Sequence, residues 1–211
     1  MEDWEAWDLY PEHRWVFNKL ELAMRLGHVC GPTPMPVPYS GNYCVRPIYN
    51  LGGMSAGAQI IFLERECVLE LPPSYFWCEQ FKGKQYSVNY EWQDERFVPV
   101  HTSIGENPQD NIYRFSRWYT VDHKHYELPL WIREFSNVKK INIEFIENNI
   151  LEIHLRQGED FPQGSSELIP VYADSDPNMI DIYVSEGWQF DEDYVDAEKN
   201  IPVARLGMLW R

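Results

Sequence analysis

Charged and glycine residues that could bind phosphate lie close together between Arg46 and Gly57. Arg46 ends a short apolar run, and the loop after it contains Gly52, Gly53, Ser55 and Gly57. Glycine lets the backbone approach a phosphate closely, so that N–H groups can point at the anion. No Gly-Lys-Ser/Thr follows, so the segment is not a Walker A motif. The pattern indicates either a phosphate-binding loop or an ordinary glycine-rich hairpin turn.

A second cluster of reactive side chains lies around residue 150. Glu152, His154 and Arg156 alternate along the chain, so in a strand they would share one face. A turn at 147–149, rich in Asn, would place Glu144 of the preceding strand beside them. Two carboxylates with a nearby donor suit a hard cation such as Mg²⁺ in the presence of phosphate. The alternative is an exposed hairpin face that carries Glu/Arg pairs.

The elements that must position these side chains are mostly strands. Apolar residues spaced among charged ones predict an amphipathic helix over 11–26, ended by Gly27. Prolines at 32, 34, 36 and 38 then require an extended linker. Strands are predicted at 43–47, 58–63, 75–79, 85–92, 141–145 and 150–155, with shorter ones at 171 and 180–184. The sequence therefore predicts an α+β fold of antiparallel sheets with few helices.

The chain is strongly acidic, with 33 Asp and Glu against 18 Lys and Arg and a net charge of −15. This balance disfavours non-specific binding to nucleic acid, which requires cations against phosphate. No apolar run approaches the roughly 18 residues of a membrane-spanning helix, and the acidic start does not resemble a secretory signal. The four cysteines lack metal-like spacing. These features predict a cytoplasmic protein without disulfides.

The acidic charge is concentrated near the C-terminus. Residues 159–211 contain twelve acidic and three basic side chains. Together with Gly158 and Pro162, this shift predicts a boundary near residue 158, between a core (1–158) and an acidic extension (159–211) packed on it. The most acidic part, 189–198, is either a solvated flap or an arm that binds a protein partner.

The order of these segments resembles the ATP-grasp family over about residues 14–157. The likeness is carried by Asn18-Lys19 at a helix start, by 43–47 with the loop 52–57, by 77–88, and by 141–145 with 151–156. It implies an ATP-grasp-like α+β fold with the nucleotide between two subdomains. These would be residues 14–77, with the glycine-rich flap, and 78–158, with the metal-binding hairpin.

The resemblance also implies a role for individual residues. Those that would bind ATP are Lys19, Arg46, Gly52, Gly53, Ser55, Gly57, Glu79, Gln80 and Phe81, the last three forming the hinge at the adenine. Those that would bind Mg²⁺ are Glu144, Glu152 and His154. Arg46 and Arg156 would act on the transferred phosphoryl group.

The chain departs from the family pattern at several positions. Arg46 replaces a lysine, which keeps the charge but exchanges a compact ammonium for a planar fork. His154 replaces an Asn, and imidazole is a poor ligand for Mg²⁺. Gln85 stands where an acid for the ribose is expected. We also expect the family's usual N-terminal domain to be missing, as in a compact protein that a phage would encode and that would act in the host cytoplasm.

Three functions remain open from the sequence. The first is an ATP-dependent carboxylate-amine ligase that works through an acylphosphate on a small carboxylate or peptide. The second is a catalytically degenerate ATP-grasp protein that only binds nucleotide, and the third is an acidic protein-interaction module. We take the first as the working hypothesis. On this hypothesis Glu152→Gln should weaken Mg·ATP binding but leave the fold intact, because it removes one of two repelling carboxylates.

Overall fold

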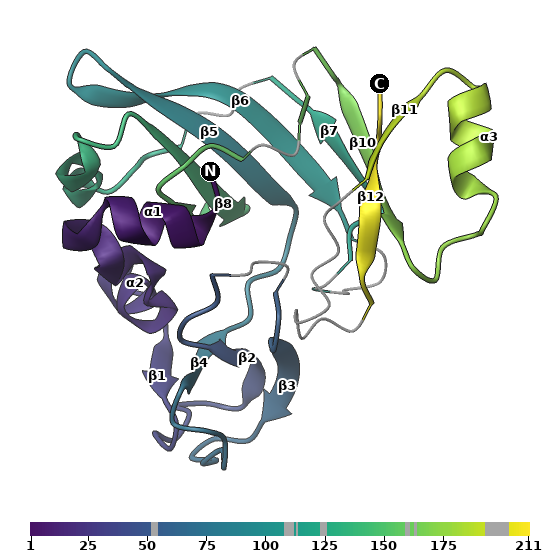
Figure 1. The fold of residues 1–211 in the computed structure, drawn as a ribbon. Coiled ribbons are helices and arrows are strands. Elements are labelled where there is room, and N and C mark those ends of the chain that lie inside the picture. Colours follow the sequence, from purple (N-terminus) through teal and green to yellow (C-terminus); the bar gives the residue numbers. More distant parts are fainter. Residues whose placement is uncertain are drawn as a thin grey trace.

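The computed structural model describes residues 1–51, 55–107, 112, 114–122, 126–158, 161–162, 164–192 and 203–211. Within these residues the chain forms a four-stranded and an eight-stranded antiparallel sheet, with helices at the N-terminal side and one near the C-terminus (Figure 1). The prediction of antiparallel sheets with few helices is therefore confirmed. No described helix has the length and apolar character needed to cross a membrane.

Two helices and a 3-10 helix make up the first 25 residues: α1 (Asp3–Leu9), η1 (Pro11–Phe17) and α2 (Lys19–Arg25). The single helix predicted over 11–26 is wrong, because Asn18 adopts an extended backbone and divides it. The Asn18 side chain accepts a hydrogen bond of 3.0 Å from the backbone N–H of Glu21, and so caps α2. Gly27, at a φ of +75°, ends α2 as predicted.

The smaller sheet has the strand order β1-β4-β2-β3. Its strands are β1 (Cys30–Pro32), β2 (Gly41–Pro47), β3 (Gln59–Leu63) and β4 (Tyr75–Glu79). Its core is formed by Val37, Tyr43, Val45, Leu63 and Trp77. Cys30, Cys78 and Cys44 lie directly opposite one another on β1, β4 and β2. These three cysteines therefore form a row across the sheet.

The larger sheet has the order β11-β12-β10-β7-β6-β5-β8-β9. Its first strands in the chain are β5 (Gln85–Gln93), β6 (Arg96–Glu106), β7 (Arg117–Thr120), β8 (Lys140–Ile146) and β9 (Asn149–His154). Alternation divides β5 into two faces. Val88 and Tyr90 belong to the main hydrophobic core, which the 3-10 helix η3 (Leu130–Phe135) also joins, whereas Ser87 and Asn89 lie on the opposite, polar face.

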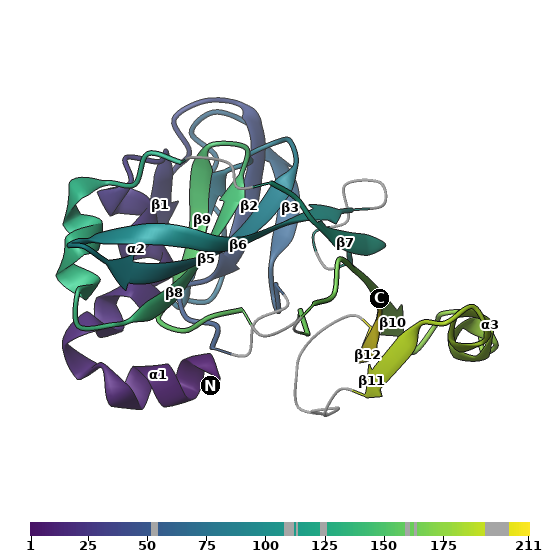
Figure 2. The ribbon, with the colours of Figure 1, turned by 90° about the horizontal axis from the view of Figure 1, so that it is seen from above.

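The C-terminal segment continues the larger sheet through β10 (Glu167–Tyr172), which pairs with β7 (Figure 2). It also contains β11 (Gln189–Glu192), β12 (Arg205–Trp210) and the helix α3 (Met179–Ser185). The segment has its own small core, formed by Ile169, Val171, Trp188 and Leu209. The acidic residues 193–202 lie outside the described residues, and the division into core and extension remains a prediction.

The strand predicted at 180–184 is wrong, because these residues lie within α3. Ile180, Ile182 and Val184 alternate as in a strand, yet Ile182 and Val184 are exposed. The apolar contacts of the helix come instead from Met179, Ile180 and Tyr183, which pack against the small core at helical spacing.

Candidate functional site

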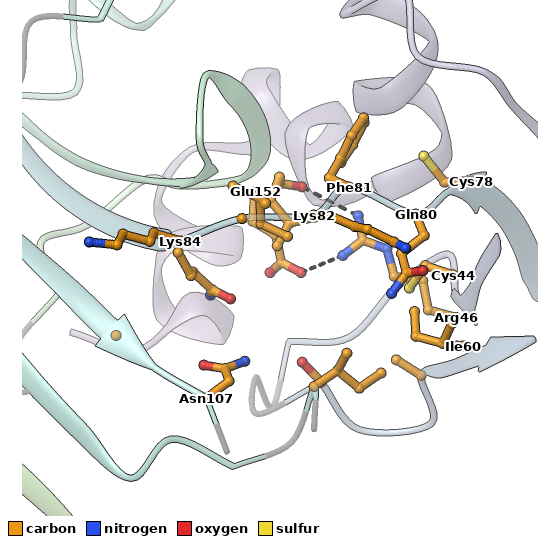
Figure 3. A pocket seen from close by; sticks show the side chains of 18 of the residues that line it. Cys44, Arg46, Ile60, Cys78, Gln80, Phe81, Lys82, Lys84, Asn107 and Glu152 are labelled. Carbon is orange, nitrogen blue, oxygen red and sulfur yellow. Dashed lines mark hydrogen bonds and ion pairs between the residues drawn. The ribbon is translucent and has the colours of Figure 1, made fainter. Parts of the chain in front are cut away.

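A cavity of about 450 Å³ lies between the smaller sheet and the larger one (Figure 3). The predicted site residues that line it are Lys19, Arg46, Ser55, Glu79, Gln80, Phe81 and Glu152. Glu144, His154 and Arg156 lie outside its wall, as does Gly57. Gly52 and Gly53 fall outside the described residues. The structure thus brings together side chains from both sheets and from α2 that are far apart in the sequence.

An ion-paired triad lies in the wall of this cavity. Lys19, the first residue of α2, places its Nζ 2.5 Å from Glu152 Oε2 of β9. Arg46, near the end of β2, places Nη1 2.7 Å from Glu152 Oε1 and donates from Nη2 to the carbonyl of Leu151 at 3.3 Å. Burial alone would raise the pKa of Glu152, but Lys19, Arg46 and His154 lower it to about 2, so the carboxylate is ionised. Two cations therefore face a single carboxylate within the triad.

Two buried polar atoms and one glycine turn distinguish the region around β2 and the predicted hinge. Arg46 Nε and Gln80 Oε1 are buried and find no hydrogen-bond partner among the described residues. The Glu79 carboxylate accepts hydrogen bonds from the Val29 N–H at 2.9 Å and from the Tyr39 hydroxyl at 3.4 Å. These two contacts hold the predicted hinge residue Glu79 in place. Gly57 has a φ of +74°, and a Cβ there would lie 2.9 Å from the Tyr75 hydroxyl oxygen. Only glycine fits this turn without strain.

The predicted metal-binding hairpin is formed by β8 and β9, where Glu144 and Glu152 are directly opposite each other. Glu144 Oε2 accepts a hydrogen bond of 3.0 Å from Gln85 Nε2. The Nε2 atom of His154 lies 3.8 Å from a carboxylate oxygen of Glu144 and equally far from one of Glu152. The three side chains share one face, as the alternation predicted. Within the described part of the chain, no three His, Cys, Asp or Glu side chains are arranged to hold a metal ion.

Asp3 also forms part of this region, although no sequence pattern indicated it. Its side chain, in the first turn of α1, is 2.7 Å from His154 Nδ1 and accepts a hydrogen bond of 2.7 Å from Arg156 Nε. Burial alone would lower the pKa of His154, but Asp3 and Glu144 raise it to about 10, so the imidazole is protonated. Arg156, held by Asp3 and by the carbonyl of Gln157 at 3.1 Å, is directed to α1. Asp3 and Ala6, one helical turn apart, are both buried and mark the face by which α1 packs, a burial that the sequence does not reveal.

The expectation that Glu152→Gln would relieve repulsion between two carboxylates is wrong for this structure. Glu152 is paired with two cations and lies near a third, the protonated His154. Removing its charge would leave Lys19 and Arg46 buried without a counter-ion, which costs stability.

At the level of sequence, no family model and no curated protein matches the chain. Solved structures do match, at low identity. The L-amino acid ligase from Bacillus licheniformis is 7% identical with a TM-score of 0.56, covering 93% of this chain and 66% of that one. N5-carboxyaminoimidazole synthetase from Staphylococcus aureus, complexed with ADP, is 10% identical with a TM-score of 0.56, covering 92% and 67%. Carboxyaminoimidazole ribonucleotide synthase from Aspergillus clavatus, complexed with ATP, is 10% identical with a TM-score of 0.52, covering 93% and 68%.

These similarities define the class of fold. The solved structures are ATP-grasp proteins, so the chain has an ATP-grasp-like α+β fold, as its sequence predicted. The chain spans about two thirds of the length of each of the three structures. At these identities the similarity establishes the fold alone.

Proposed function

We propose that this protein binds ATP in the cavity between its two sheets and uses it to join a small carboxylate to an amine. The observation that carries the proposal is the convergence of Lys19 and Arg46, from different elements, on Glu152 in the wall of that cavity. Two buried cations with one carboxylate leave an excess of positive charge for the phosphates of a nucleotide. The buried Arg46 Nε and Gln80 Oε1, both bordering the cavity, would gain partners from a bound ligand.

Magnesium fits the hairpin through Glu144 and Glu152, which lie opposite each other on β8 and β9. Mg²⁺ commonly takes one or two protein carboxylates and completes its shell with phosphate oxygens and water. His154, protonated and held by Asp3, has no lone pair to offer. We therefore assign the metal to the two carboxylates and give His154 the role of a neighbouring hydrogen-bond donor. In this arrangement Lys19 and Arg46 exchange Glu152 for phosphate oxygens when the nucleotide binds.

The reaction class is phosphoryl transfer followed by acyl transfer. A carboxylate oxygen takes the γ-phosphoryl group of ATP with release of ADP. An amine then forms the C–N bond as phosphate leaves and the amine loses a proton. Lys19 and Arg46 would orient the phosphates and stabilise the negative charge that develops on them. The flap around Ser55 would exclude water, which would otherwise hydrolyse the acylphosphate.

Calorimetric titration of Mg·ATP tests the nucleotide site. Arg46→Gln should weaken binding by about tenfold or more, because a hydrogen bond to a charged group contributes about 1.5–3 kcal/mol. Arg46→Gln leaves Lys19 paired with Glu152, so the remaining pair is neutral and a loss of binding can be separated from a loss of folding. Arg65→Gln is the control, since that side chain is 72% exposed. If Mg·ATP at millimolar concentration binds none of the folded proteins, the proposal is wrong.

A second candidate function, nucleotide binding without turnover, is favoured by one observation. Asp3 holds both His154 and Arg156, two residues for which the resemblance implies roles in metal binding and phosphoryl transfer. Release of ADP from Mg·ATP in the presence of a carboxylate and hydroxylamine distinguishes the two functions. The ligase should release ADP and form a hydroxamate, and the binding protein should do neither. Binding of a protein partner by the acidic segment after residue 158 stays a prediction.

A further inference from the structure

A second, smaller cavity of about 150 Å³ adjoins the nucleotide cavity. Ser55 and Ile112 line both, so the two spaces share part of a wall. The smaller cavity lies over the polar face of β5 and β6 and is closed on its other side by β10 and β12. It is therefore built partly from the C-terminal segment, which adds these strands to the larger sheet.

Strand register connects this cavity to the carboxylates of the nucleotide site. One row of directly opposed residues runs across four neighbouring strands of the larger sheet, from Glu152 through Glu144 and Ser87 to Ser103. Glu152 lines the nucleotide cavity, whereas Glu144, Ser87 and Ser103 line the smaller one. The carboxylate pair to which we assign magnesium therefore stands at the boundary between the two cavities.

The floor of the smaller cavity is polar and fixed in place. Asn142 Nδ2 donates to Ser87 Oγ and to Asn89 Oδ1, both at 2.8 Å. Asn89 also exchanges hydrogen bonds of 2.8 Å and 3.1 Å with the backbone of Gly158. Because the Ser87 oxygen is already an acceptor, its own hydrogen is available to donate into the cavity. These contacts hold the polar groups before any ligand arrives, which lowers the entropic cost of binding.

The opposite wall is apolar and carries one positive charge. Trp118, Phe161, Leu168 and Met208 supply the apolar surface. Arg205 of β12 is the one permanent cation among the described residues that line this cavity. A cavity of roughly 150 Å³ accommodates a body about the size of one benzene ring. Polar floor, apolar wall and cation together select a small acid with a flat or compact apolar body.

We propose that this smaller cavity binds the carboxylate acceptor, a monocarboxylic acid whose apolar body is about the size of one ring. This inference rests on the proposed function, because it places the acid beside the phosphates bound in the first cavity. Arg205 attracts the acid, and the Glu144 end of the cavity is where its carboxylate would meet the γ-phosphoryl group. The acid then takes the phosphoryl group with release of ADP, as in the reaction described above. The substrate class is thereby narrowed from any small carboxylate or peptide to a compact apolar acid.

The experiment uses the full chain in the presence of Mg·ADP and the probe benzoate, with benzyl alcohol and benzylamine as neutral and cationic analogues. Ligand-observed NMR gives the affinity of each probe. Benzoate should bind at least tenfold more tightly than either analogue, and Arg205→Gln should remove that preference. Arg117→Gln is the matched control, because Arg117 pairs with Glu167 and lines neither cavity. Ser103→Leu, which fills the floor, should abolish benzoate binding without changing β12.

Mg·ATP affinity, measured for the same variants, separates the two proposals. Arg205→Gln and Ser103→Leu should leave it within about twofold of the unmodified chain, because neither residue lines the nucleotide cavity. If Mg·ATP binds but benzoate does not, or binds equally well to Arg205→Gln, the acceptor site is wrong and the nucleotide site stands. If benzoate binds through Arg205 but Mg·ATP does not bind at all, the proposed function fails and the acceptor role fails with it.

Discussion

Replacing Asp3 by Asn tests whether buried charges hold the N-terminal helix α1 against the hairpin of β8 and β9. The Asp3 side chain is 4% exposed and faces two cations, His154 and Arg156, each at 2.7 Å. Removing one partner of a buried ion pair costs about 3–5 kcal/mol, because the remaining charge has no counter-ion. His154 can release its proton once Asp3 is neutral, so we expect the lower end, about 3 kcal/mol. For a chain of this length that corresponds to a fall of about 6–12 °C in melting temperature.

Urea denaturation and scanning calorimetry measure this effect directly. Asp8→Asn is the matched control on the same helix, because Asp8 is 76% exposed and lies 3.6 Å from Arg14. Exposed pairs of this kind contribute about 0–1 kcal/mol. The control should therefore melt within about 4 °C of the unmodified chain. An Asp3→Asn variant that is as stable as Asp8→Asn would refute the view that these buried charges hold α1 in place.

Three further predictions concern the same region and the smaller sheet. Glu152→Gln should lower the free energy of unfolding by about 3–5 kcal/mol, because Lys19 and Arg46 lose their counter-ion. Urea denaturation measures this change, and a variant as stable as the unmodified chain would contradict the prediction. The pKa of His154 is raised to about 10, so its contribution to stability is complete below about pH 6.5 and is lost as the pH rises towards 10. Urea denaturation of the unmodified chain should give a lower free energy of unfolding at pH 9.5 than at pH 7, and this difference should be smaller in Asp3→Asn. Equal differences in the two proteins would count against the pairing of Asp3 with His154. Burial raises the pKa of the Cys78 thiol to about 12, so iodoacetamide at pH 8 should modify the half-buried Cys67 faster than Cys78, as peptide mass spectrometry can determine.

Local sequence pattern was sufficient for most strands but not for contacts between distant segments. The predicted strand 141–145 lies within β8, where apolar residues recur with a period of two. The predicted strand 75–79 coincides with β4, a short apolar run that is buried at its centre. The same rule failed at 180–184, where packing against the small C-terminal core decided in favour of a helix. The apolar spacing predicted one helix across 11–26, whereas the family resemblance placed a helix start at Asn18-Lys19, which is where α2 begins.

The candidate site was only partly accessible to such reasoning. The opposition of Glu144 and Glu152 follows from a short hairpin, which is local, so alternation and the turn predicted it. The pairing of Asp3 with His154 joins residues 151 positions apart, and no local signal fixes such a contact. The pairing of both predicted phosphate-binding cations with Glu152 was not foreseen either, because the family resemblance assigned those residues to ligands instead of to one another.

The separation of Arg46 and Glu152 along the chain has a consequence for how the protein acquires its site during synthesis. The two residues are 106 positions apart, so the ribosome makes both Lys19 and Arg46 long before their shared carboxylate. Closing so long a loop costs little more free energy than closing one of half the length, but contacts of high sequence separation slow folding. A nascent chain that ends before β9 therefore carries both cations without the carboxylate that pairs with them in the folded protein. The wall of the larger cavity is complete only once β9 has been made, because Glu152 is the last described residue along the chain that lines it.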